Sequence, residues 1–310
     1  MAANDTESAL VTEIAKAPRA TTIYRRAIRS SLRRRPDEAT GTGLPATELV
    51  LRGVDITLDR VAAYNRVCGF RLSDALPVTY PHVLAFPLAM QVMSEPGFPL
   101  PVVGLIHVAN RVTQARTIHL DERLDLTVRA AALRPHERGL QFDVGATATI
   151  DGREVWHGIS TYLRRAPTDG APTASGVDDS ALNVACATDS VATGADQPPP
   201  TGLWHVAADT GRAYAAVSGD HNPIHVSRVG ARAFGFRHPI AHGMWTMARA
   251  VAALEGRLGE TYTVDVSFVR PILLPSTVAW RARRDDGGWT IAVTDPDSNR
   301  PRLTGSIAPA

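Results

Sequence analysis

The same succession of expected elements occurs twice along the chain, and this repeat constrains the fold more than any other feature. Each copy begins with a strand and a helix that ends at a glycine, continues through a second apolar helix, and ends with four alternating strands. Tyr64 and Gly69 are five residues apart in the first copy, as are Tyr214 and Gly219 in the second. The repeat indicates an internal duplication and an α+β architecture, in which each copy is a helix packed against an antiparallel sheet.

The expected strands have apolar residues at every second position. They cover residues 49–58, 104–112, 124–130, 140–146, 155–163, 203–206, 262–268, 277–283, 289–294 and 303–307. On 104–112 the alternation places Ile106 and Val108 on the same face as Val112. The expected helices combine apolar spacing with capping residues. They run from an N-cap at Asp59 to residue 67, over 86–93, from an N-cap at Asp209 to residue 217, over 229–234 and over 243–258.

Composition divides the chain into four parts. They are a basic N-terminal arm (1–45), a first copy (46–165), a linker rich in Pro, Ala and Thr (166–202) and a second copy (203–310). The arm has no acidic residue between Glu13 and Asp37, so we expect a solvated segment. Tyr24, Ile28 and Leu32 also fit a short amphipathic helix, which would contact an anionic membrane or an acidic carrier protein.

The totals are typical of a soluble protein that acts inside the cell. The 310 residues carry a formal net charge of +2 and are 44% hydrophobic, which gives no sign of a nucleic-acid partner. Cys68 and Cys186 lack metal-ligand spacing, and no apolar run is long enough to span a membrane. We therefore expect a cytoplasmic protein. We expect it to be a monomer or a homodimer.

The second copy contains groups suited to removing a proton from carbon. Asp220 and His225 lie in one short loop, and Gly243 begins an expected helix. A carboxylate and an imidazole can move protons, and a backbone N–H at a helix N-terminus can stabilise negative charge on oxygen. Taken singly, such an aspartate is often a turn former. The first copy has Phe70 and Ala75 in place of Asp220 and His225, so we expect one active site per chain.

A longer pattern surrounds these residues. It comprises Tyr214, Ser218-Gly219-Asp220-His221-Asn222-Pro223-Ile224-His225, Ala231, Ala233, Gly235-Phe236 and Ile240-Ala241-His242-Gly243-Met244. The pattern resembles the hydratase 2 motif of the MaoC-like (R)-specific enoyl-thioester hydratases and dehydratases, which have the hot dog fold. The two copies together resemble the double hot dog type of actinobacterial 3-hydroxyacyl-thioester dehydratases, whose N-terminal copy lacks catalytic residues.

The resemblance implies roles for residues of this sequence. Asp220 and His225 would be the catalytic pair, and Gly243 would offer its backbone N–H to the thioester carbonyl. Asn222 would be the amide that shapes the loop. We also expect Asn222, His242 and Met244 to bind substrate, with packing at the start of the helix as the alternative for His242. The implied reaction is the reversible dehydration of (3R)-hydroxyacyl thioesters to trans-2-enoyl thioesters in fatty-acid metabolism. Its substrates would be thioesters of CoA or acyl carrier protein, and it would need no metal or other cofactor.

Two other functions stay open at this point. A hot dog acyl thioesterase would hydrolyse the thioester instead of dehydrating the acyl group. A non-catalytic acyl-thioester binding module would bind the substrate without turnover. The carrier, the acyl chain length and the assignment of the two proton transfers to Asp220 and His225 stay open.

Overall fold

The structure is a computed structural model that describes residues 10–18, 22–23, 43–166 and 199–310. Its strands are β1 (Leu10–Glu13), β2 (Thr47–Asp55), β3 (Leu105–Gln114), β4 (Arg123–His136), β5 (Gly139–Ile150), β6 (Arg153–Arg165), β7 (Gly202–Val206), β8 (Tyr262–Phe268), β9 (Ser276–Asp285), β10 (Gly288–Thr294) and β11 (Pro301–Pro309). Its helices are α2 (Leu58–Cys68), α3 (Tyr80–Met93), α4 (Thr210–Ser218), α5 (Pro223–Val226), α6 (Arg228–Ala233) and α7 (Gly243–Ala252).

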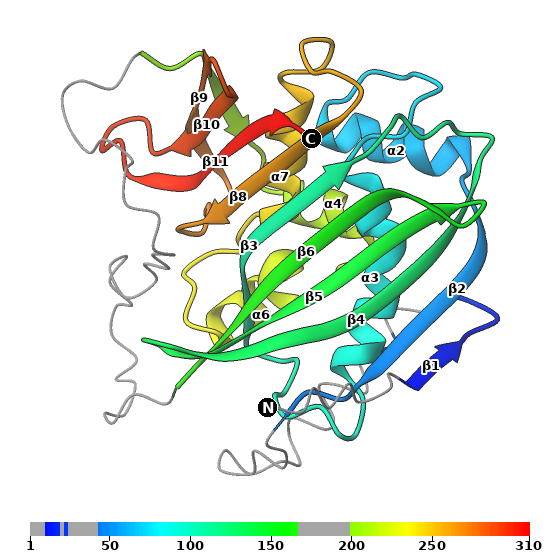
Figure 1. Ribbon diagram of the computed structural model, residues 1–310. Coiled ribbons are helices and arrows are strands. Elements are labelled where there is room, and N and C mark those ends of the chain that lie inside the picture. Colours follow the sequence, from blue (N-terminus) through cyan, green and yellow to red (C-terminus); the bar gives the residue numbers. More distant parts are fainter. Residues whose placement is uncertain (1–9, 19–21, 24–42, 167–198) are drawn as a thin grey trace, which may run out of the picture.

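The described strands form one sheet, and its order is symmetric about the centre. The order is β1-β2-β4-β5-β6-β3-β8-β11-β10-β9-β7, so that β2, β4, β5, β6 and β3 correspond to β7, β9, β10, β11 and β8. Strands β3 and β8 pair antiparallel at the centre and join the two halves (Figure 1). The expected α+β fold with two hot dog copies is therefore confirmed.

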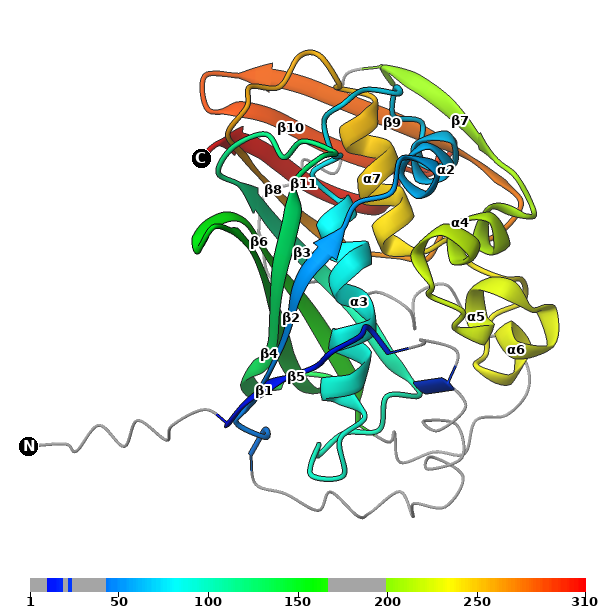
Figure 2. The same cartoon turned by 90° about the vertical axis from the view of Figure 1, so that its right-hand side faces the viewer.

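Helices α3 and α7 lie on the same side of the curved sheet (Figure 2). Ten residues of α3 are buried, which agrees with its almost wholly apolar sequence. Two tryptophans fix the helices in place. Trp156 on β6 donates its indole N–H to the Val78 carbonyl just before α3, at 2.7 Å, and Trp245 on α7 donates to the Val67 carbonyl of α2, at 3.0 Å. The second bond links α7 of the second half to α2 of the first.

The glycines that end α2 and α4 adopt the same conformation, in agreement with the sequence repeat. Gly69 has a φ of 87° and Gly219 a φ of 76°, a left-handed conformation in which a Cβ would be strained. The tyrosines five residues earlier, Tyr64 and Tyr214, are both buried, with their rings 6.2 Å apart. The loop that follows Gly219 therefore begins at the boundary between the two halves.

Three helix boundaries differ from the predictions. Thr57, and not Asp59, is the N-cap of α2, and Asp59 lies in the first turn, where its charge still complements the helix dipole. Helix α3 begins at Tyr80 and not near residue 86, because Pro81 is compatible with the first turn of a helix. Helix α7 ends well before residue 258, because the chain turns after it and Gly256 has a φ of 79°.

A bulge in β3 changes which of its residues face the helices. The register against β6 shifts between His107 and Ala109, which makes Val108 the extra residue. Val108 packs with Leu163 in a small separate cluster, whereas the His107 ring stacks on Tyr162 and borders the interior cavities described below. The alternation predicted over 104–112 is therefore wrong for Ile106 and Val108, which precede or form the bulge and do not share the face of Val112.

Strand β1 was not expected in the N-terminal arm. It pairs in parallel with the first residues of β2, so residues 10–13 form an edge of the sheet while their side chains stay exposed to solvent. The helix predicted around Ile28 lies outside the described residues, as does nearly all of the predicted linker. No described helix has both the length and the apolar character needed to cross a membrane.

Candidate active site

Asp220 lies in the loop that follows α4, and Asn222 caps the short helix α5. One carboxylate oxygen of Asp220 accepts the backbone N–H of Asn222 at 3.1 Å, and the Asn222 side chain accepts the N–H of Ile224 at 3.4 Å. These bonds are the turn chemistry expected of Asp and Asn in such a loop. They also hold the loop that carries both side chains. Asp220 is therefore a turn former and the candidate catalytic residue at the same time.

One hydrogen bond orients the ring of His225, which lies in α5. Its Nδ1 is 2.8 Å from the backbone carbonyl oxygen of Ile240. Since a carbonyl only accepts, Nδ1 carries the proton and Nε2 keeps its lone pair. Burial lowers the pKa of His225 and outweighs the opposing effects of the Asp220 charge and the bond to Ile240. A lowered pKa makes the ring mostly neutral at pH 7, with a basic nitrogen available.

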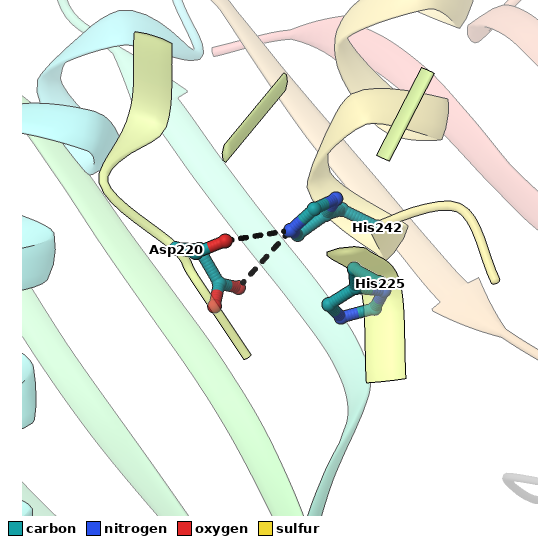
Figure 3. A group of neighbouring side chains, drawn as sticks. All are labelled: Asp220, His225 and His242. Carbon is teal, nitrogen blue, oxygen red and sulfur yellow. Dashed lines mark hydrogen bonds and ion pairs between the residues drawn. The ribbon is translucent and has the colours of Figure 1, made fainter. Parts of the chain in front are cut away.

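His242, the N-cap residue of α7, supports the other two residues. Its Nε2–H donates to the backbone oxygen of Asp220 at 3.0 Å and lies 3.8 Å from the carboxylate (Figure 3). Its ring stacks on that of His225, with centroids 3.7 Å apart. Only 2% of His242 is exposed, and burial, together with His225, lowers its pKa to about 3. The buried neutral ring packs against Asp220 and His225 at the start of α7, and the substrate contact expected of His242 stays a prediction.

The side chains of Asp220, His225 and His242 form one cluster (Figure 3). Ligand atoms of the three lie within 4.8 Å of one another, so a water molecule between Asp220 and His225 can hydrogen bond to both. Two imidazoles and a carboxylate can also hold a divalent cation. The expectation of a metal-free site therefore stays a prediction.

Gly243 is the first residue of α7. Its backbone N–H belongs to the first turn, whose donors have no acceptor within the helix, and it lies at the positive end of the helix dipole. A Cβ at this position would lie 3.0 Å from three atoms of the Phe268 ring, which is tighter than ordinary contact. The absence of a Cβ therefore lets an acceptor atom approach the backbone N–H of Gly243, which points away from the helix.

Two cavities meet at these residues. The smaller, of about 300 Å³, is bordered by His225 and Gly243, and the larger, of about 490 Å³, by Asp220 and Met244. The residues that border both are Leu105, His107, Asn222 and Phe234. The predicted site residues thus gather where the cavities join. His242 is the exception, because it is absent from the described residues that border either cavity.

Polar residues of the first half also border the larger cavity, and the sequence-based predictions name none of them as site residues. They are His82 on α3, His107 on β3 and Tyr162 on β6. Burial lowers the pKa of His82 to about 4, and burial together with His82 lowers that of His107 to about 3, so both are neutral at pH 7. His82 could have been noticed as a polar residue in an apolar helix. His107 carries no such signal, because the bulge turns it inward.

Gly211 on α4 controls the position of His225, and we expect Gly211→Ala to impair the site. A Cβ at Gly211 would overlap the backbone carbonyl oxygen of His225. Helix α5 must then move away, and a displacement of about 1 Å can cost about 10²-fold in rate. The measurement is kcat/KM for enoyl-CoA hydration. Gly202→Ala is the matched control, because nothing lies within 4 Å of its Cβ position. Full activity of Gly211→Ala would contradict this account of how His225 is placed.

Comparison with known proteins identifies the class. A family model described as "MaoC like domain" matches residues 192–293. The relative 3-hydroxyacyl-thioester dehydratase X of Mycobacterium tuberculosis is 34% identical over 266 residues, which cover 85% of this chain and 90% of the relative. The chain therefore belongs to the MaoC-like dehydratase family.

Solved structures agree with this assignment. The crystal structure of HtdX from M. tuberculosis matches with a TM-score of 0.72 at 32% identity and covers 85% of this chain and 100% of that one. An acyl-ACP thioesterase from Bacteroides thetaiotaomicron matches with a TM-score of 0.53 at 9% identity and covers 84% of this chain and 97% of that one. The second likeness concerns the fold alone, so the fold by itself does not separate dehydration from hydrolysis.

Proposed function

We propose that the protein catalyses the reversible dehydration of (3R)-hydroxyacyl thioesters to trans-2-enoyl thioesters. The observation that carries the proposal is the meeting of Asp220, His225 and Gly243 where two cavities join. The relative named 3-hydroxyacyl-thioester dehydratase X supports the same reaction. The following roles of single residues belong to this proposal.

Gly243 stabilises the negative charge that develops on the thioester oxygen. Removal of the proton at C2 leaves its electron pair to delocalise toward the thioester carbonyl, which acquires enolate character. A backbone N–H at the start of α7 can hydrogen bond to this oxygen, and the helix dipole adds to the stabilisation. The donor is already in place before the reaction, so no reorganisation is needed when the charge forms.

Asp220 and His225 move the two protons. In the dehydration direction the C2–H bond breaks, a C2–C3 double bond forms, and the C3 hydroxyl leaves as water after it gains a proton. In the hydration direction the same two groups hold the water that adds at C3, since their ligand atoms lie no more than 4.8 Å apart. His225 is suited to accept a proton, since its Nε2 lone pair is not used by the bond to Ile240.

The two cavities determine the orientation in which the substrate binds. The larger cavity is lined mainly by apolar residues, several of them from α3: Val83, Phe86, Met90 and Met93. An acyl tail fits this environment, because each buried methylene contributes about 0.8 kcal/mol. With the thioester carbonyl at Gly243, the carrier then extends into the smaller cavity, which Gly243 borders. The first half thus serves as the wall of the acyl pocket.

Hydrolysis of the thioester is the second candidate, since a thioesterase shares the fold. One assay separates the functions. Purified protein is incubated with a trans-2-enoyl-CoA, and loss of the enoyl absorbance is followed alongside release of free thiol. The proposal predicts loss of the enoyl group with no thiol release. Thiol release without hydration would identify a thioesterase, and binding without either change would identify a non-catalytic module.

The larger cavity predicts a preference for long acyl chains. We expect kcat/KM to be more than tenfold higher for dodecenoyl-CoA than for crotonyl-CoA, since the longer tail buries more methylenes against α3. Val83→Phe narrows this cavity and should reduce dodecenoyl turnover while crotonyl turnover is kept. A wild-type preference for crotonyl-CoA would contradict the assignment of the larger cavity to the acyl tail.

A further inference from the structure

Three arginines border the smaller cavity and come from distant parts of the chain. Arg165 ends β6 of the first half, Arg270 follows β8, and Arg302 lies on β11 of the second half. No aspartate or glutamate is among the described residues that border this cavity. The charged side chains that border it are therefore all cationic, whereas the larger cavity is bordered by the Asp220 carboxylate.

Of the three arginines, Arg165 is the one that a bound anion would stabilise most. Two of its guanidinium nitrogens, Nε and Nη2, are buried and make no hydrogen bond within the protein. Buried N–H donors without an acceptor are costly, and more so on a charged group. Burial lowers the pKa of Arg165, and the charge of Arg138 lowers it further. An anion in the cavity would satisfy the donors and offset both effects.

Arg302 differs from Arg165 in having acceptors of its own. Its two terminal nitrogens donate to the Pro271 carbonyl at 3.0 Å and to the Asp295 carboxylate at 3.3 Å. These bonds hold the guanidinium in place, and Asp295 partly balances its charge. Arg165 is consequently the residue whose substitution tests an anion site most directly, and Arg270 adds a further positive charge to the same cavity.

We propose that Arg165, with Arg270 and Arg302, binds the phosphate of the phosphopantetheine arm that carries the acyl group. The proposal rests on the proposed function, which places the carrier in the smaller cavity. Guanidinium groups bind phosphate oxygens through paired, charge-assisted hydrogen bonds. The larger cavity would repel the same phosphate because it contains Asp220. The phosphate next to pantetheine is common to CoA and to acyl carrier protein, so both carriers can use the site.

The test compares thioesters with and without this phosphate. Arg165→Met removes the charge and keeps most of the apolar stem, and Arg165→Lys keeps a positive charge. With enoyl-CoA and enoyl-acyl carrier protein, we expect Arg165→Met to raise KM about 10- to 100-fold with little change in kcat. Arg165→Lys should recover part of this loss. With enoyl-pantetheine, which has no phosphate, both variants should match the wild type. Exposed Arg129 is the control position, and Arg129→Met should change nothing.

Equal losses with and without the phosphate would show that Arg165 acts on packing alone and would overturn the proposal. A loss confined to enoyl-CoA would also contradict it, because the effect would then come from phosphates that acyl carrier protein lacks. Equilibrium binding of CoA and of pantetheine to the same variants gives a result that does not depend on turnover. If the wild type hydrates neither thioester, the proposed function fails, and weaker binding of CoA, but not of pantetheine, by Arg165→Met would still support the phosphate site.

Discussion

Asp220→Asn and His225→Gln will each lower kcat for enoyl-CoA hydration by about 10²- to 10⁴-fold, the contribution typical of a general acid–base group. Asparagine keeps an oxygen that can accept the N–H of Asn222 at 3.1 Å, but it cannot accept a proton from substrate or water. Glutamine likewise keeps hydrogen-bonding groups in place of the imidazole without its basic nitrogen. Steady-state hydration of dodecenoyl-CoA is the measurement, and thermal unfolding checks that each variant is folded.

His221→Gln is the matched control for this pair. His221 lies in the same loop, between Asp220 and Asn222, but its side chain is exposed. We expect its substitution to leave kcat within about twofold, since surface substitutions of this kind seldom perturb the structure. Near wild-type hydration by either Asp220→Asn or His225→Gln would contradict the proposed proton transfers, whatever the result for His221.

Gly243→Pro will lower kcat by about 10²- to 10³-fold relative to Gly243→Ala, because only the proline removes the backbone N–H. The position suits this comparison. Gly243 is the first residue of α7, where proline is readily accommodated. The preceding residue, His242, has a φ of −67° and a ψ of 138°, which is the extended conformation that a following proline requires.

Gly243→Ala isolates the steric part of the change. Both variants place a Cβ about 3.0 Å from the Phe268 ring, so both incur the same contact. The difference in kcat between them then measures the hydrogen bond from the N–H. Equal kcat values for the two variants would show that this N–H does not stabilise the reaction, and the oxyanion donor would have to be sought elsewhere.

The part of the site that could be predicted from sequence is the part that is local. Asp220, Asn222 and His225 lie within six consecutive residues. Turn and cap chemistry place Asp220 and Asn222 without reference to the rest of the fold, whereas the ring of His225 is oriented by the Ile240 carbonyl. The repeat was also readable, because Gly69 and Gly219 each end a helix in a conformation that favours glycine. Where only short-range geometry decides, residue types and spacing are sufficient.

The residues that sequence reasoning missed are placed by long-range pairing. His107 faces the cavities only because a bulge shifts the register of β3 against β6, and no local pattern marks that bulge. Arg165 and Arg302 border one cavity because β6 ends and β11 begins near it in the assembled sheet. The ring of His242 is likewise placed by a distant segment, because it turns toward Asp220 in the loop after α4 and is buried there.

The stereochemistry of hydration tests the central claim most directly. Wild-type protein is incubated with trans-2-dodecenoyl-CoA, and the 3-hydroxyacyl product is resolved on a chiral column while free thiol is measured in the same sample. The arrangement of Asp220, His225 and Gly243 as a MaoC-like site predicts the (3R)-hydroxyacyl-CoA with the thioester intact. Formation of the (3S) product, or release of CoA without hydration, would contradict it.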